Sequence, residues 1–214
     1  MDKTHGTVDR FATTLAMSST ASVAGALNHN ALALSTSSTK PPALTQAKVR
    51  VPFKELSANI IADLLIDLCN EYGDVLTNLK LQLLLYYAQA WYLALYNKPL
   101  FQDRFEAWIS GPIQPDVYAK FLPFTHRPIQ QDTSNWDVPK RVSKHIVELM
   151  EAYGSMTAFD LSRLARQEHP WIEARGGLDV DEPSMTQLRI ETMREYYRAR
   201  LNEQEKPANS SDKA

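Results

Sequence analysis

Cysteine is nearly absent from this chain of 214 residues, because Cys69 is the only one. A single cysteine excludes a disulfide within the chain and also a cysteine-rich zinc site. It fits a reducing compartment, and we expect a cytoplasmic protein. No stretch approaches the roughly 18 consecutive apolar residues of a membrane-spanning helix, so no membrane association is predicted.

Sequence motifs for catalysis, nucleotide binding and metal binding are also missing. The histidines lack the H-E-x-x-H spacing, and the chain has no C-x-x-C, G-x-S-x-G, G-x-x-x-x-G-K-[ST] or G-x-G-x-x-G motif. We therefore predict no catalytic residue, no metal and no cofactor. One enzymatic alternative stays open, a hydrolase or transferase with an unfamiliar site near Glu168, His169 and Arg175. The competing interpretation is structural: His169 lies near a helix C-terminus, where the helix dipole favours an imidazolium.

Charged side chains are absent between Phe11 and Ser38, where Ala, Ser, Thr, Asn and Leu dominate without a sustained period. Such a segment buries too little apolar area to offset its conformational entropy. We predict a flexible low-complexity extension over residues 1–50, one folded domain over 51–205 and a disordered tail over 206–214. The mixed charge of the first three residues argues against a signal peptide.

Basic residues are the minority in the predicted domain, since residues 51–205 contain 16 Lys and Arg against 22 Asp and Glu. This balance disfavours nucleic acid as a partner, because phosphate affinity comes from clustered basic side chains. The arginines near the C-terminus alternate with glutamates, a pattern typical of a solvated helix with charge pairs. A localised DNA contact for autoregulation is the alternative.

Apolar periodicity and capping residues predict a mainly helical domain. Ser57 caps a helix that ends at Gly73, with Ile60, Ile61, Leu64, Leu65 and Leu68 on one side and Asp63, Asp67 and Asn70 on the other. Thr77 caps a second helix, which is apolar and aromatic nearly all round and must therefore be central. Further helices are predicted over 140–153 and from Thr157 to before Pro170. A terminal helix is predicted to begin at a capping box at Ser184–Gln187 and to end near residue 205.

A short β element interrupts the helices. Phe105, Ala107 and Ile109 alternate with Glu106, Trp108 and Ser110, and the chain then turns at Gly111 and Pro112. The pattern predicts a hairpin or extended arm with the first set on the core. Pro115 opens a short helix, and residues 122–137 read as a long surface loop. The fold class is therefore one mainly α domain with a central apolar helix and a minor β-hairpin.

Two sequence motifs carry a family resemblance. Residues 79–118 read LKLQLLLYYAQAWYLALYNKPLFQDRFEAWISGPIQPDVY, and residues 159–177 read FDLSRLARQEHPWIEARGG. Both resemble the Panacea domain of bacterial, phage and prophage antitoxins, over roughly residues 55–200. The resemblance implies a phage-defence setting and a toxin-binding protein rather than an enzyme. The chain departs from the family pattern in three places: Leu83 replaces a lysine, Ala90 replaces a glycine, and the loop before Pro170 reads Gln167-Glu168-His169.

The resemblance implies a cognate protein toxin, encoded next to this protein, as the partner. The expected contact residues are Glu106, Trp108, Ser110, Gly111, Pro112 and Trp171. An exposed tryptophan is a frequent interface anchor, although both tryptophans have a packing interpretation as well. The alternative function is an adaptor that delivers a toxin or another partner to a Clp-type protease, with the N-terminal extension as its tether.

Overall fold

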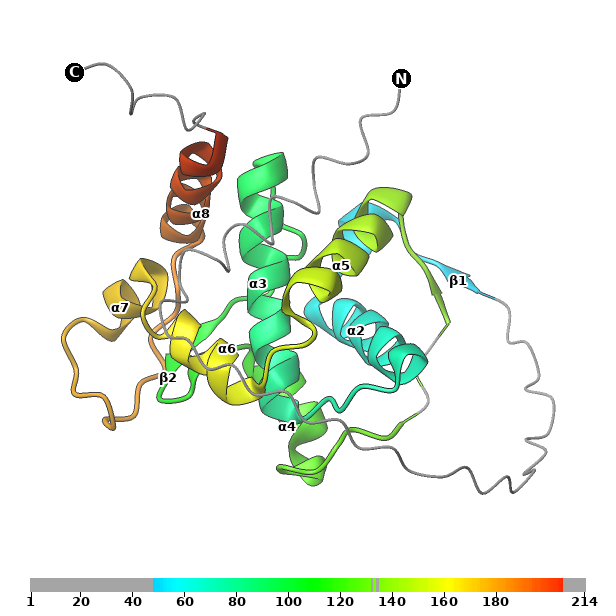
Figure 1. Ribbon diagram of the computed structural model, residues 1–214, viewed down its shortest axis with the longest axis horizontal. Helices are drawn as coiled ribbons and strands as arrows, with labels where there is room; N and C mark the ends of the chain where they lie inside the picture. The colour runs from blue at the N-terminus through cyan, green and yellow to red at the C-terminus, as the bar shows by residue number, and fades with distance from the viewer. Residues whose placement is uncertain (1–47, 132, 134, 206–214) are drawn as a thin grey trace, which may run out of the picture.

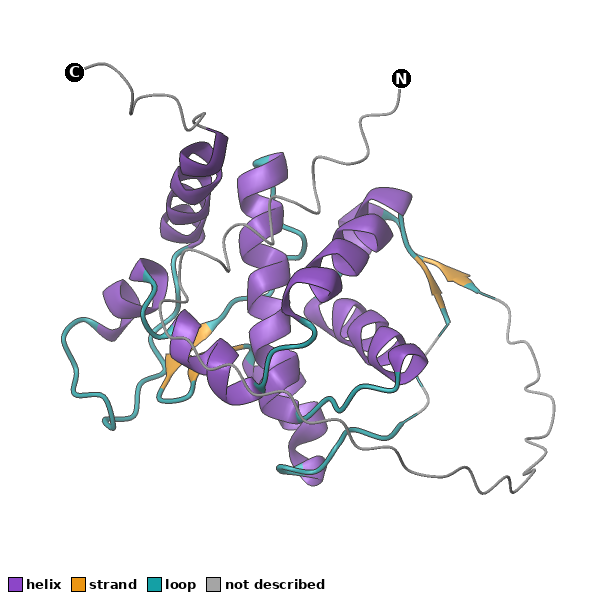
Figure 2. Ribbon diagram, viewed as in Figure 1, coloured by secondary structure: helices purple, strands orange, loops and turns teal. Residues whose placement is uncertain are grey.

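The structure is a computed structural model that describes residues 48–131, 133 and 135–205 (Figure 1). It is mostly helical with a short β-hairpin, as the sequence predicts, and it has a second pair of short strands that the sequence does not predict (Figure 2). Its elements are β1 (Val49–Arg50), η1 (Phe53–Glu55), α2 (Ala58–Tyr72), α3 (Asn78–Tyr96), β2 (Glu106–Trp108), β3 (Gly111–Ile113), α4 (Pro115–Phe121), η2 (Leu122–Phe124), β4 (Trp136–Asp137), α5 (Lys140–Tyr153), α6 (Ala158–Ala165), α7 (His169–Arg175) and α8 (Ile190–Glu205).

Helix α3 is the centre of the fold, and α2, α4, α5, α6, α8 and β3 all pack against it (Figure 1). Thr77 caps it by accepting a hydrogen bond from the amide of Lys80. Even Gln82 and Gln89 are buried, with exposures of 0% and 1%. The prediction of a central helix is confirmed, because an all-round apolar surface can only be satisfied by neighbours on every side.

The two buried glutamines of α3 hold the chain that follows it. The side-chain oxygen of Gln89 accepts from the amide of Leu100 at 2.7 Å, and its amide nitrogen donates to the carbonyl of Phe101 at 2.9 Å. Gln82 accepts from the amide of Gln114 at 2.9 Å, just after β3. A buried backbone group needs a hydrogen-bond partner, so these glutamines position the hairpin on α3.

Helix α2 begins and ends as predicted, and its buried face is shifted from the predicted one but shares Ile61 and Leu65 with it. Ser57 caps its start, and Gly73 ends it in the left-handed conformation. The fully buried side chains are Ala58, Ile61, Ala62, Leu65, Ile66 and Cys69, whereas Ile60, Leu64 and Leu68 are only partly buried. The placement of Asp63 on the polar side is wrong, because it is buried and pairs with Lys120 at 3.1 Å.

The predicted hairpin forms, and a third segment extends it. Strands β2 and β3 pair antiparallel, with Ala107 opposite Pro112. On the other edge of β2, the amide of Ala107 donates to the carbonyl of Thr186, and the amide of Leu188 donates to that of Phe105. The predicted capping box at Ser184–Gln187 is therefore wrong, because this stretch is extended along β2 and α8 begins only at Ile190.

The segment over residues 122–137 is more than the predicted surface loop. It contains η2 and a buried Ile129, and it ends in β4, which pairs parallel with β1. Trp136 donates its indole N–H to Asp63 at 3.0 Å and ties β4 to α2. The predicted N-terminal extension over 1–50 lies outside the described residues except for its last three, of which two form β1.

The last third of the chain is helical, with one correction. Helix α5 has the predicted bounds, and Thr157 caps α6 by accepting from the amide of Asp160. The region from His169 to Arg175 is a short helix, α7, so His169 lies at a helix N-terminus and not at a C-terminus. Among the described residues, no helix combines the length and the apolar character needed to cross a bilayer.

Candidate functional site

Trp108 lies at the end of β2, half-buried rather than fully turned to solvent. Its indole N–H donates to the carboxylate of Glu106 at 2.7 Å, and its ring meets the edge of Tyr118 at 5.0 Å between centroids. Both predicted partner residues are therefore only partly exposed, and Trp108 is oriented by its neighbours. A pre-oriented aromatic side chain loses little entropy when a partner contacts it.

Trp171 is a packing residue that joins α7 to β2. Its side chain is 7% exposed, and its indole N–H donates to the carbonyl of Trp108 at 3.0 Å. The guanidinium groups of Arg166 and Arg175 lie over its ring, 5.6 and 5.3 Å from the centroid. Of the two interpretations of Trp171, packing and partner contact, this geometry favours packing. Trp171 stabilises the hairpin by its hydrogen bond to β2.

The hairpin turn is held at two further points. The hydroxyl of Ser162 on α6 donates to the carbonyl of Ser110 at 2.6 Å. Gly111 has a φ of +122°, and a Cβ there would lie 3.1 Å from Cδ2 of Leu83 on α3. Gly111 and Pro112 are both buried and shape the turn, and so they would position a partner-binding surface rather than form it.

One exposed apolar side chain at this end of the fold is Ile109, which sequence alternation predicted to face the core. It is 39% exposed, because β2 ends at Trp108 and the turn reorients the next residue. A cavity of about 420 Å³ opens here. It is lined by Trp108, Ile109, Ser110, Pro183, Ser184 and Met185. We call it the hairpin groove. Most of its half from 183 to 185 lies in the stretch that the sequence pattern assigned to a helix cap, so no local signal placed it beside the hairpin.

A buried carboxylate lies on the other side of the hairpin, between α3 and α8. Glu168 precedes α7, and its carboxylate accepts from the hydroxyls of Tyr197 at 2.5 Å and Tyr86 at 3.2 Å. Arg200 donates to its other oxygen at 3.1 Å. Burial raises the pKa of Glu168 from 4.5 to about 7, although these hydrogen bonds and the arginine favour the charged form.

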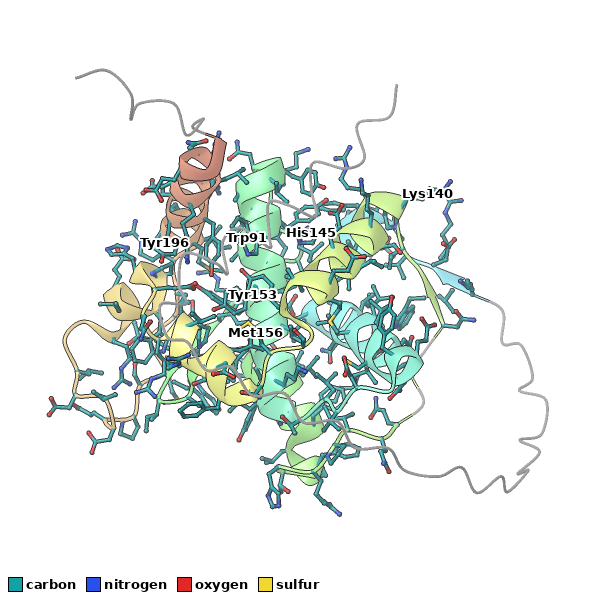
Figure 3. All side chains as sticks on the ribbon, viewed as in Figure 1. Trp91, Lys140, His145, Tyr153, Met156 and Tyr196 are labelled. Atoms are coloured by element: carbon teal, nitrogen blue, oxygen red, sulfur yellow. The ribbon has the colours of Figure 1, made fainter. Side chains whose placement is uncertain are left out.

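Aromatic rings close this cluster off from solvent. The ring of Tyr197 meets that of Trp91 at 5.0 Å, and the indole N–H of Trp91 donates to the hydroxyl of Tyr153 at 2.9 Å. Figure 3 labels Trp91 on α3 and Tyr153 at the end of α5, with Tyr196 on α8. The arrangement fastens α8 to the centre of the domain through a polar group with several partners.

The residues of the enzymatic alternative are not brought together. Glu168 faces the tyrosines, His169 is exposed, and Arg175 donates to the backbone carbonyls of Glu182 and Asp179. Each side chain thus serves a different part of the fold, and this geometry does not support the alternative of a joint site. In the described part of the chain, no three His, Cys, Asp or Glu side chains gather as a metal ion would require.

The segment that contains the hairpin is similar to a known protein family. Residues 81–172 match the family described as "Antitoxin SocA-like, Panacea domain". The family resemblance seen in the sequence is therefore confirmed over this segment. It contains most of α3, the hairpin, α4 to α6 and the start of α7, whereas residues 183–185 of the hairpin groove lie beyond it.

A curated relative supports the same assignment. The protein described as "Antitoxin SocA" from Caulobacter vibrioides (strain NA1000 / CB15N) is 38% identical over 68 residues. That alignment covers 32% of this chain and 36% of the relative, and so the two proteins are similar over about a third of each. No solved structure matches this chain.

Proposed function

We propose that this protein is the antitoxin of a toxin–antitoxin pair and neutralises a cognate protein toxin by binding it directly. The match to an antitoxin family over residues 81–172 supports a binding role. The partner is a protein, and the gene next to this one is the first place to look for it. This proposal assigns no chemistry to the domain.

The observation that carries the proposal is an exposed apolar groove on a rigid frame. Ile109 and Met185 stand 39% and 77% exposed on either side of it. The turn beneath Ile109 is held by Ser162, Trp171 and the packing of Gly111 on Leu83. Exposed apolar groups on a pre-organised surface gain affinity, because little conformational freedom is lost when a partner covers them.

Growth rescue tests the proposal directly. Cells expressing the neighbouring gene alone should stop growing, and co-expression of this protein should restore growth and give a complex that co-purifies. Ile109→Asp should weaken rescue and co-purification at least tenfold, because it places a carboxylate in the groove. Val75→Asp is the matched control, since Val75 is an exposed apolar residue between α2 and α3.

The toxin level in the same cells separates neutralisation by binding from delivery to a Clp-type protease. Direct binding leaves the toxin at its normal level in a stable complex. Delivery lowers the toxin level, depends on the protease and leaves no stoichiometric complex. Deleting residues 1–47, which lie outside the described structure, should leave direct binding intact. A harmless neighbour that never binds this protein would overturn the proposal.

A further inference from the structure

The segment between α7 and α8 combines acidic and exposed apolar side chains. Between Gly176 and Gln187 there are three acidic residues, Asp179, Asp181 and Glu182, and no basic one. Val180 and Met185 in the same segment are 62% and 77% exposed. We call residues 178–185 the acidic loop. Its last three residues form one wall of the hairpin groove, directly after the acidic run.

The acidic loop is held in place at both ends. Arg175 donates to the backbone carbonyls of Asp179 and Glu182, and the amide of Glu182 donates to the carbonyl of Asp179 at 3.1 Å. At its far end the chain joins β2, through the bond from Ala107 to Thr186 at 2.9 Å. The loop therefore keeps its side chains outward without support from a regular element of its own.

The flanking arginines leave the three carboxylates largely uncompensated at the surface. The guanidinium of Arg175 is buried, with the residue 4% exposed, and is directed at carbonyl oxygens. Arg189, at the other end, pairs with Glu173 on α7 at 3.4 Å. A surface of this kind attracts a positive partner over a distance of about one Debye length, roughly 8–10 Å in physiological salt.

We propose that the hairpin groove and the acidic loop form one docking surface for a basic–apolar segment of the protein partner. An aliphatic or aromatic side chain enters the groove between Ile109 and Met185, and neighbouring lysines or arginines face Asp179, Asp181 and Glu182. This inference rests on the proposed function and names the chemistry of the toxin surface that is bound. Apolar contact holds the complex together, and the carboxylates accelerate its formation.

Binding kinetics with the purified toxin test the role of the carboxylates. The triple variant Asp179→Asn, Asp181→Asn and Glu182→Gln should lower the association rate about tenfold at low salt, and the rate should then depend little on salt. The matched control is Glu191→Gln, Glu195→Gln and Glu203→Gln, three exposed residues of α8. The control removes the same net charge from another surface and should leave the rate within about twofold.

A second variant tests the groove. Met185→Ser should raise the dissociation rate at least fivefold with little change in the association rate, because it removes apolar contact and no charge. Val49→Ser is its control, an exposed apolar residue of β1. Equal association rates for the two triple variants, with the wild type bound, would overturn this inference and leave the proposed function standing. A wild-type protein that fails to bind the toxin would overturn both.

Discussion

The region between α3 and α8 and the hairpin end of the fold differ in which side chains they bury and which they expose. Toward α8, Glu168 is surrounded by tyrosines and Arg200, and Tyr197 is fully buried. At the hairpin end, apolar Ile109 and Met185 are exposed. The first region buries a carboxylate with hydrogen-bond partners inside the fold, and the second leaves apolar groups exposed. We therefore expect stability and toxin binding to depend on different residues, and substitutions should separate the two.

The largest effect on stability should come from Tyr197, whose ring contacts those of Trp91, Tyr86 and Tyr87. Tyr197→Ala should lower the free energy of unfolding by about 3–5 kcal/mol, as for other large-to-small changes in a core. Tyr197→Phe keeps the ring and loses the hydroxyl bond to Glu168, and should cost about 1–3 kcal/mol. Urea denaturation followed by circular dichroism measures both. A loss below 1 kcal/mol for the alanine variant would mean that α8 contributes little to the core.

A pH series tests the buried carboxylate. The raised pKa of Glu168, about 7 against 4.5, means that the folded protein keeps a proton that the unfolded chain releases. Stability from this group therefore falls as the pH rises from about 4.5 to 7. Relative to wild type, the free energy of unfolding of Glu168→Gln should rise by up to about 3 kcal/mol between pH 4.5 and 7, because the glutamine amide cannot ionise.

The difference between variant and wild type isolates Glu168 from an opposing group. Burial lowers the pKa of His145 to about 4, so its contribution is present above pH 6.5 and is lost as the pH falls from there toward 4. His145 is present in both proteins, and its effect cancels in the difference. Glu191→Gln, at an exposed position of α8, is the control substitution. A difference for Glu168→Gln that does not change between pH 4.5 and 7 would refute the raised pKa.

An intermediate effect is expected at the hairpin turn. Gly111→Ala introduces a methyl group 3.1 Å from Leu83 at a φ of +122°, and should cost about 2–3 kcal/mol. Gly176→Ala is the matched control, because its φ is +61° and the new Cβ has nothing within 4 Å. It should cost about 1 kcal/mol. Thermal unfolding of both proteins checks the order, and equal losses would mean that Leu83 moves aside freely.

The smallest effect on stability should be at the binding surface. Ile109→Ser should change the free energy of unfolding by less than about 0.5 kcal/mol, as is usual for exposed positions, and yet should weaken toxin binding. Val75→Ser should leave both properties unchanged. Chemical denaturation and a binding titration on the same samples provide the comparison. A large loss of stability for Ile109→Ser would show that this residue belongs to the core.

The accuracy of the sequence predictions follows the range of the interactions concerned. The starts of α2, α3 and α6 were predictable, because Ser57, Thr77 and Thr157 each cap an amide three residues away. The extended segment of residues 186–188 beside β2 was not predictable, because Thr186 accepts a hydrogen bond from Ala107, a residue far away in the sequence. The same holds for Asp63, which is buried only because Lys120 and Trp136 reach it.

The predicted partner residues are less exposed than the sequence pattern suggested. The motif at residues 105–112 pointed to the hairpin, yet Gly111, Pro112 and Trp171 proved to be buried there. Ile109 was assigned to the core, because the alternation of apolar and polar residues continues through it and the sequence does not show that the strand ends at Trp108. Met185 received no role, because no local pattern places it beside the hairpin.

The sequence by itself determined the capped helices, the central position of α3 and the family resemblance of residues 81–172, since all of these depend on local pattern. Only the tertiary structure decided the joining of residues 186–188 to β2, the burial of Glu168 among tyrosines and the opening of the hairpin groove. These features unite residues tens of positions apart. Their partners are selected by packing of the whole chain, which no window of sequence contains.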